Sequence, residues 1–315
     1  MNVRQSLLLR KGVASATLIL VVLFHAVRAS AGPAEEYLGR GVRRAEAGDY
    51  RGAVDDFSRS ISLRPKNPEA YYNRGLARGF SGDLKGAISD YSRAIALEPK
   101  AVAAYNNRGF AKAALGQFAS AIADISKAID LEPQLPELYN NRGAVRNSMM
   151  DYRSAIADFD KALQLNPHLA GVYNNRGLAK SFLGDVSGAI EDFTKSVTID
   201  QRYSAAWYNR GNARVSLGDA QGAVEDYSRA IVLDPKMLVA WNNRAFARIR
   251  LGDYNGAISD LGVIITIAPD NASGWYNRGV AKKLSGDRTG AVEDLRRAAS
   301  LGDSLAVEVL KELQP

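Results

Sequence analysis

Ionisable residues recur along this chain of 315 residues at a fixed spacing of 34. One position always holds arginine, a second basic residue follows four residues later, and an aspartate follows the arginine by sixteen. The arginines are Arg40, Arg74, Arg108, Arg142, Arg176, Arg210, Arg244 and Arg278; the second basic residues are Arg44, Arg78, Lys112, Arg146, Lys180, Arg214, Arg248 and Lys282; the aspartates are Asp56, Asp90, Asp124, Asp158, Asp192, Asp226, Asp260 and Asp294. These repeated charges have two possible interpretations: they form ion pairs between packed helices, or the basic residues form a stripe that binds an anionic ligand.

We favour ion pairs, because every arginine comes with an aspartate of its own. Residues four apart lie one turn apart on a helix, so both basic side chains of a repeat face the same way. The predicted structural network includes Arg74, Asp90, Arg108, Asp124, Arg142, Asp158, Arg176 and Asp192.

Residues for catalysis or metal binding are scarce. The chain has no cysteine and two histidines, of which His168 follows Pro167 in a predicted loop. Without cysteine there is neither a thiol nucleophile nor a thiolate metal site. No glycine-rich phosphate loop follows a strand. We therefore expect no enzymatic activity, no cofactor and no metal site.

The elements that position these residues are helices. We number each repeat from 1 to 34, with starts at residues 34, 68, 102, 136, 170, 204, 238 and 272. Position 4 is always tyrosine or tryptophan, position 20 is alanine, and position 24 is apolar or aromatic. These spacings of three and four are helical. Between them lies a Gly-Asp pair in most repeats, in which glycine suits the end of one helix and aspartate caps the next. Proline at position 32 ends the second helix.

This pattern resembles the tetratricopeptide repeat family. Aromatic-4, Gly-8, Gly-15, Ala-20, Ala-27 and Pro-32 at a period of 34 carry the resemblance, over residues 34–305. It implies an all-α, right-handed superhelical solenoid of eight helix-turn-helix repeats, with the first helices lining a concave groove. Departures are Met150 for the turn glycine, Gln201 for proline, and Gly262 and Ile264 in the seventh repeat. Residues 304–315 are predicted to form a helix that caps the last repeat.

Asparagine at position 6 is the strongest candidate for ligand binding. Asparagine costs about 0.5 kcal/mol relative to alanine in a helix, so seven copies call for a reason. Its amide offers a donor and an acceptor, which match a peptide backbone. It looks like the asparagine ladder of some superhelices of this family. Bonding to neighbouring residues, or an inherited consensus, is the alternative. The predicted peptide-binding groove contains Asn73, Asn107, Asn141, Asn175, Asn209, Asn243 and Asn277, with Tyr72, Tyr208, Tyr276, Phe110 and Phe246.

Residues 1–31 have the order of a secretory signal peptide. Basic residues precede an apolar run over residues 13–27, and Ala29-Ser30-Ala31 follows. The run is shorter than the roughly 20 residues that a membrane-spanning helix needs. We predict cleavage after Ala31 and export to the periplasm or the medium of a bacterial cell, with an uncleaved membrane anchor as the alternative.

Charge and repeats together indicate the class of partner. The leader holds four of the 41 basic residues and none of the 34 acidic ones, so the rest of the chain is nearly neutral. Nucleic-acid binding would call for clustered basic residues with stacking aromatics. We expect an exported, non-catalytic scaffold that binds a protein or extended peptide in its groove. It would bind no nucleic acid, and would contact a membrane only if the leader is retained. The alternative is a membrane-tethered or self-associating component of an envelope or secretion assembly.

Overall fold

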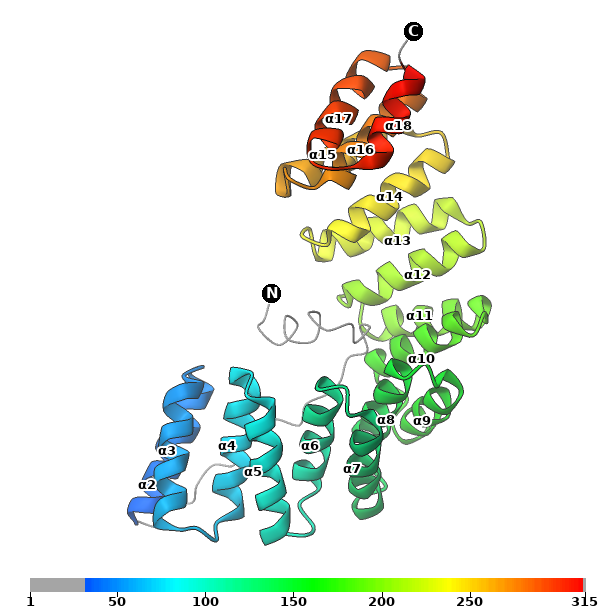
Figure 1. The fold of residues 1–315 in the computed structure, drawn as a ribbon. Coiled ribbons are helices and arrows are strands. Elements are labelled where there is room, and N and C mark those ends of the chain that lie inside the picture. The colour runs from blue at the N-terminus through cyan, green and yellow to red at the C-terminus, as the bar shows by residue number, and fades with distance from the viewer. Residues whose placement is uncertain (1–31, 314–315) are drawn as a thin grey trace. The chain divides into compact units, whose positions relative to one another are not determined.

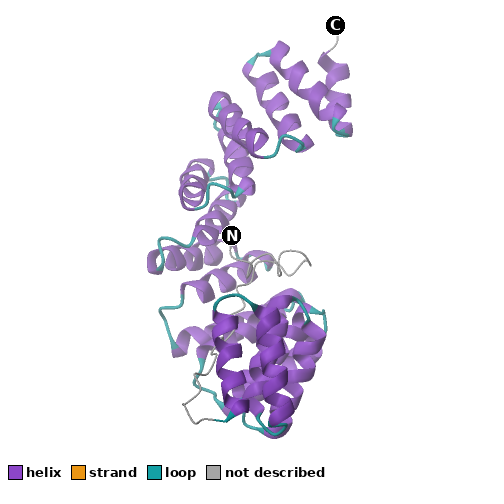
Figure 2. Ribbon diagram, turned by 90° about the vertical axis from the view of Figure 1, so that its left-hand side faces the viewer, coloured by secondary structure: helices purple, strands orange, loops and turns teal. Residues whose placement is uncertain are grey.

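The computed structural model describes residues 32–313, all of whose regular structure is helical (Figures 1 and 2). The helices are α2 (Pro33–Glu46), α3 (Tyr50–Leu63), α4 (Pro68–Ser81), α5 (Leu84–Leu97), α6 (Val102–Ala114), α7 (Phe118–Leu131), α8 (Pro136–Ser148), α9 (Tyr152–Leu165), α10 (Ala170–Phe182), α11 (Val186–Ile199), α12 (Ser204–Ser216), α13 (Ala220–Leu233), α14 (Leu238–Arg250), α15 (Tyr254–Ile267), α16 (Ala272–Ser285), α17 (Arg288–Ser300) and α18 (Ser304–Leu313). The predicted all-α class is confirmed, with two consecutive helices in each repeat. The predicted signal peptide lies outside the described residues.

The chain divides into two compact units, residues 1–179 and 180–315. The first unit contains α2 to α9 and most of α10, and the second contains α11 to α18.

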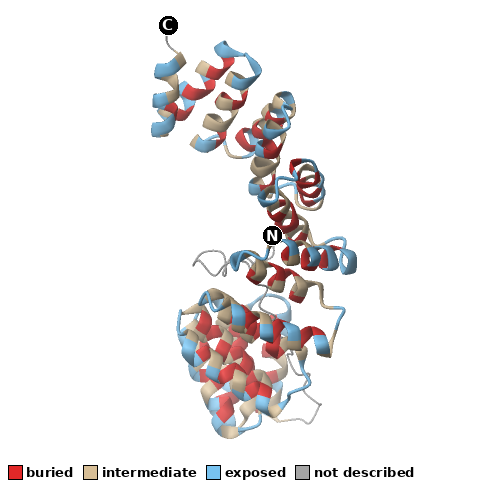
Figure 3. Ribbon diagram, turned by 90° about the vertical axis from the view of Figure 1, so that its right-hand side faces the viewer, coloured by how far each residue is buried: buried red, intermediate tan, exposed pale blue. Residues whose placement is uncertain are grey.

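The core of each repeat contains a large side chain at position 24 of the second helix, which faces position 8 of the first; that position is glycine except in the seventh repeat, where it is Ala245. Tyr91 is almost fully buried, and a Cβ atom at Gly75 would lie 2.7 Å from its ring. Phe159 packs in the same way against Gly143. Glycine therefore lets the two helices of a hairpin approach closely, and buried residues recur along the helices of both units (Figure 3).

The turn between the two helices explains the Gly-Asp pair. Gly82 has a φ of 91°, in the left-handed region that favours glycine. The Asp83 side chain accepts a hydrogen bond from the Gly86 amide and so caps α5. Met150 takes the glycine position in the fourth repeat with a φ of 62°. A side chain in this region costs about 1–2 kcal/mol, so this turn is strained.

The last helix, α18, packs against the final repeat. Ala306 is buried and joins Leu295 and Ala298 of α17 in one apolar cluster. Lys283 of α16 pairs with Glu312 of α18 at 2.7 Å. Solenoid ends need such cover, because the outer face of the last repeat is otherwise apolar. No helix among residues 32–313 combines the length and the apolar character needed to cross a bilayer.

Candidate functional site: ion network, asparagine ladder and exposed faces

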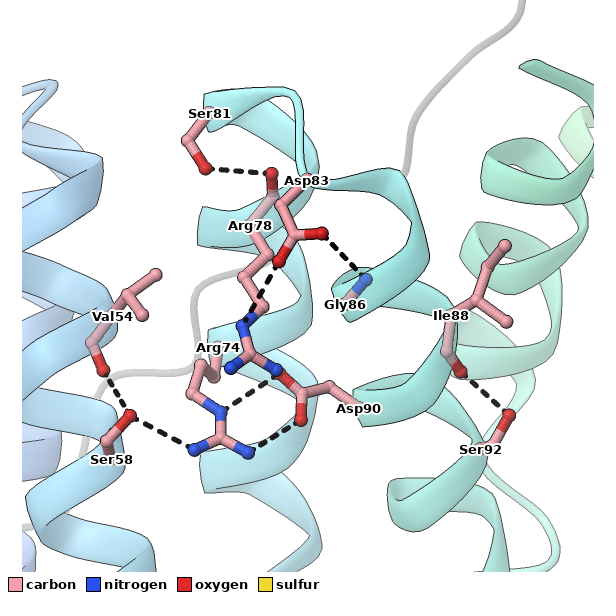
Figure 4. Close-up of polar contacts among 10 residues, drawn as sticks. All are labelled: Val54, Ser58, Arg74, Arg78, Ser81, Asp83, Gly86, Ile88, Asp90 and Ser92. Atoms are coloured by element: carbon pink, nitrogen blue, oxygen red, sulfur yellow. Dashed lines mark hydrogen bonds and ion pairs between the residues drawn. The ribbon is translucent and has the colours of Figure 1, made fainter. Parts of the chain in front are cut away.

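The ionic positions form a network centred on the aspartate of each repeat. Asp90 is 2% exposed and accepts two hydrogen bonds from Arg74, Nε to Oδ2 at 2.9 Å and Nη2 to Oδ1 at 2.7 Å (Figure 4). Arg78 donates a third at 2.7 Å. A carboxylate removed from water needs such partners, and a two-pronged arginine contact is among the strongest available. The aspartate therefore holds the first helix of its repeat to the second.

The same arginine also joins neighbouring repeats. Arg74 Nη1 donates to the Ser58 hydroxyl of the preceding repeat at 3.0 Å, and that hydroxyl donates to the Val54 carbonyl (Figure 4). Serine or threonine at position 25 plays this part in several repeats; the further pairs are Arg108–Ser92, Arg142–Ser126, Arg210–Thr194 and Arg244–Ser228. Gly262 holds this position in the seventh repeat and offers no hydroxyl to Arg278. These hydroxyls were not among the predicted contacts, although serine or threonine recurs at position 25 in the sequence.

The structure shows which partners meet. It brings together Arg74 with Asp90, Arg108 with Asp124, and Arg142 with Asp158, each pair within one repeat. Arg176 and Asp192 belong to different units. Arg176 pairs with Asp160 at 2.6 Å, and Asp192 pairs with Lys180 at 2.9 Å.

Two further effects stabilise these charges. The arginine at position 7 lies over the aromatic ring at position 4 in every repeat, as Arg244 does over Trp241 at 4.8 Å. In the first repeat, hydrogen bonding by Arg40 holds the pKa of Asp56 below its usual value. The cations at positions 7 and 11 are thus occupied by structural contacts rather than presented as a stripe.

The position-6 asparagines form a ladder between consecutive first helices. Asn141 Nδ2 donates to Asn106 Oδ1 at 3.0 Å, one repeat earlier. Asn107 donates in the same way to the Tyr72 hydroxyl at 3.0 Å. The further rungs are Asn175–Asn140, Asn243–Tyr208 and Asn277–Asn242. In each of these rungs the residue at position 5 of the preceding repeat accepts, and Asn243 donates in addition to Asn212 at 3.0 Å. The sequence pattern did not predict this pairing.

This arrangement corrects the expected groove. Asn73, Asn107, Asn141, Asn175 and Asn209 are buried, as is Tyr72, so their side chains are not open to a ligand. Their amides join repeats to one another, which is the alternative that the sequence analysis considered. Apart from Asn209, the predicted groove residues of the second unit differ: Asn243, Asn277, Tyr208 and Tyr276 are half-buried, and Phe246 is exposed. Phe110, in the first unit, is half-buried.

Asn73 is an exception within the ladder. Position 5 of the preceding repeat is Leu38, a buried apolar residue that cannot accept a hydrogen bond. Both polar atoms of the Asn73 amide are buried without a partner among the described residues. A buried amide without partners costs about 1–3 kcal/mol. Asn73 is therefore expected to destabilise the first unit, whereas Asn107, Asn141 and Asn175 each make a hydrogen bond to the preceding repeat.

Exposed apolar side chains lie on the first helices of the second unit. Phe246 of α14 is 47% exposed, Leu284 of α16 48%, and Val239 of α14 55%. They occupy positions 9, 13 and 2, which share one face of a helix. Charged residues are few at these positions in this unit. Among residues 32–313 no cluster of three or more potential metal ligands occurs.

Solved structures share this fold. A crystal structure of the APC/C hetero-tetramer Cut9-Hcn1 aligns with a TM-score of 0.57 and 16% identity, covering 89% of this chain and 56% of that one. A tetratricopeptide repeat protein from Parabacteroides merdae aligns with a TM-score of 0.56 and 21% identity, covering 78% of this chain and 96% of that one. MamA from Desulfovibrio magneticus aligns with a TM-score of 0.52 and 20% identity, covering 56% of this chain and 99% of that one. This chain thus spans 56% of the length of the Cut9-Hcn1 chain it matches.

Family models match most of the repeats, whereas a comparison with curated proteins finds no match. One tetratricopeptide repeat model matches residues 136–169 and 204–237. A second tetratricopeptide repeat model matches residues 102–135 and 170–203. A TPR repeat model matches residues 41–79 and 81–116. These segments together extend over more than half of the chain. The chain belongs to the tetratricopeptide repeat family.

Proposed function

We propose that this protein is a non-catalytic scaffold, exported from the cell that makes it, which binds an extended polypeptide along the first helices of its repeats. Proteins of the family are mainly scaffolds for protein–protein interaction, and the first helices line the concave groove that the resemblance implies. Binding is assigned to the second unit, because the buried asparagine ladder of the first unit leaves few amides open.

The observation that carries this proposal is the exposed apolar face of α14 and α16. Val239, Phe246 and Leu284 are large side chains that a folded protein would otherwise cover. The half-buried Asn243 and Asn277 lie on the same two helices. Asn243 Nδ2 donates to both Tyr208 and Asn212, whereas Asn277 Nδ2 donates to Asn242. Apolar contacts would select side chains of the peptide, and amides would bind its backbone. Ordering the peptide offsets much of this, so we expect about micromolar affinity.

A pair of variants tests the location. Sixteen-residue peptides selected against the wild-type protein from a random display library serve as ligands, with affinity measured by fluorescence anisotropy. Phe246→Ser together with Leu284→Ser should weaken binding at least tenfold. Val232→Ser with Ile267→Ser, two exposed residues of α13 and α15, should change it less than twofold. Equal affinities of the first variant and the wild type would contradict the proposal.

Salt gives a second criterion. Few charges lie on the exposed face of these first helices, so affinity should change little between 50 and 300 mM NaCl. A steep loss of binding with salt would place the peptide on another surface.

Export is tested separately. Intact-mass measurement of the protein from the envelope and the medium of a producing bacterium should give a chain that begins after Ala31. A membrane-bound chain that keeps residues 1–31 would favour the tethered alternative.

A further inference from the structure

A cluster of exposed basic residues lies on the second helices of repeats 2 to 4, away from the ion network. Positions 18, 22, 26, 29 and 33 form the outer face of each second helix and the loop after it. In these three repeats they hold one acidic residue, Asp130. The basic residues, which we call the basic face, are Lys85, Arg93, Lys100, Lys127, Arg153 and Lys161. All are exposed except the half-buried Lys161.

The cations of the basic face take no part in the ion network that holds the helices together. Within residues 32–313, none of the six forms a salt bridge, whereas the cations at positions 7 and 11 all do. Lys161 donates to Gln164 at 3.0 Å, and Arg93 lies over the Tyr71 ring at 5.9 Å. A guanidinium resting on a ring keeps its edge free for an anion.

The second unit carries the same cations in a different setting. Lys195, Arg229 and Arg297 at position 26 each follow a glutamate by four residues, namely Glu191, Glu225 and Glu293. A carboxylate one turn earlier offsets the charge of each cation. Position 22 holds Ser89, Ala123 and Ala157 in repeats 2 to 4, so no carboxylate precedes these cations by one turn. The one acidic residue on this face is Asp130, three residues after Lys127.

We propose that the basic face binds an acidic segment of a partner protein. Carboxylates are the groups that exposed arginine and lysine recognise, and six cations against the single carboxylate of Asp130 give this face a net positive charge. A bilayer fits less well, because interfacial helices insert large apolar side chains and the neutral residues here are small. Single-stranded nucleic acid fits less well, because no exposed aromatic residue interleaves with the cations. This surface is separate from the one in the proposed function.

The probe is a fluorescein-labelled peptide of twenty residues with glutamate at every second position, and its control replaces each glutamate by glutamine. With the full chain at 20 mM NaCl, anisotropy should show binding of the acidic peptide alone. Affinity should fall at least tenfold at 300 mM NaCl, because these charges are exposed to screening.

Matched variants locate the site. Arg93→Gln, Lys127→Gln and Lys161→Gln combined should weaken binding at least tenfold. Lys195→Gln, Arg229→Gln and Arg297→Gln combined should weaken it less than twofold. Both variants should keep the wild-type circular dichroism, because glutamine is a good helix former. Phe246→Ser with Leu284→Ser should leave this binding intact, so the two proposals can fail independently.

Several results would overturn the proposal. They are equal losses in the two triple variants, equal binding of the glutamine peptide, or binding of anionic phospholipid vesicles without binding of the acidic peptide.

Discussion

The two units build the same ladder of hydrogen bonds but bury it to different extents. Asn141 of the first unit bonds to Asn106 at 3.0 Å, and both are 1% exposed. Asn277 of the second unit bonds to Asn242 at 2.9 Å, and both are half-buried. A repeated sequence position can therefore be buried in the first unit and partly exposed in the last two repeats of the second, although Asn209 of the second unit is buried too. Water can replace a lost partner only where the position is partly exposed.

The ion network does not differ in this way. Asp90 and Asp158 in the first unit are as buried as Asp226 and Asp260 in the second. Each receives a two-pronged contact from the arginine of its own repeat. The network is therefore the common framework of both units, and the units differ in the surfaces that they add to it.

The largest expected effect tests that common framework. Asp158→Ala in the first unit and Asp226→Ala in the second should each cost about 3–5 kcal/mol of unfolding free energy, because the half-buried Arg142 and the buried Arg210 lose the carboxylate that pairs with them. The three tryptophans, Trp207, Trp241 and Trp275, all lie in the second unit. Urea unfolding followed by tryptophan fluorescence therefore reports on Asp226→Ala, and circular dichroism reports on both variants.

The control for that prediction is Asp130→Ala at an exposed site, which should change stability by less than about 0.5 kcal/mol. A cost below about 1 kcal/mol at Asp158 would mean that the network is not structural, and would return the cations to ligand binding.

Breaking one hydrogen bond of the asparagine ladder should cost more stability in the first unit than in the second. Asn141→Ala should cost about 1–3 kcal/mol, because it leaves the buried Asn106 oxygen without this donor. Asn277→Ala should cost under about 1 kcal/mol, because water reaches its half-buried partner. The comparison is made with the same two unfolding signals. Similar costs at both sites would show that the difference in burial has no energetic consequence.

The seventh repeat offers a gain of stability. Gly262→Ser should stabilise the second unit by about 2 kcal/mol, because it adds helix propensity and a hydroxyl for Arg278. A Cβ atom at Gly262 would lie 3.7 Å from Arg278 Nη1, so there is space. Gly262→Ala isolates the propensity term at about 1 kcal/mol. Because alanine has the higher helix propensity, a gain with serine that falls below the gain with alanine would mean that the hydroxyl contributes nothing.

Replacing Asn73 by leucine should change the unfolding free energy in the opposite direction to the same replacement at Asn141. Asn73→Leu removes an unpartnered buried amide opposite Leu38 and should stabilise the first unit by about 1 kcal/mol. Asn141→Leu provides the contrast, since it breaks a rung and should destabilise. Loss of stability in both variants, measured by urea unfolding, would show that Asn73 has a polar partner.

The smallest effect concerns the turn of the fourth repeat. Met150→Gly should stabilise the first unit by about 1 kcal/mol, since it removes a side chain from a left-handed backbone conformation. Gly218→Ala is the reverse change at the same turn of the sixth repeat, whose φ is 82°, and should destabilise by a similar amount. Melting temperatures would show the two shifts, and an unchanged value for Met150→Gly would mean that this turn is not strained.

The sequence by itself determined the family, the helical class and the places where helices begin and end. The 34-residue period, the Gly-Asp turn at Gly82 and the proline at Pro99 depend on local backbone preferences, and α4 and α5 follow them. Spacing also predicted that Arg74 and Asp90 serve one network, because helical periodicity tells which residues share a face.

Only the tertiary structure decided which neighbours those faces meet. Periodicity could not show that Asn141 points at Asn106 rather than at a ligand, because that depends on how consecutive repeats rotate against each other. Nor could it show that Asn107 is buried while Asn277 is half-buried, because burial depends on the residues that neighbouring helices place around each amide. Local chemistry along the chain therefore determines the helices, and packing between repeats decides which of their polar groups remain available for binding.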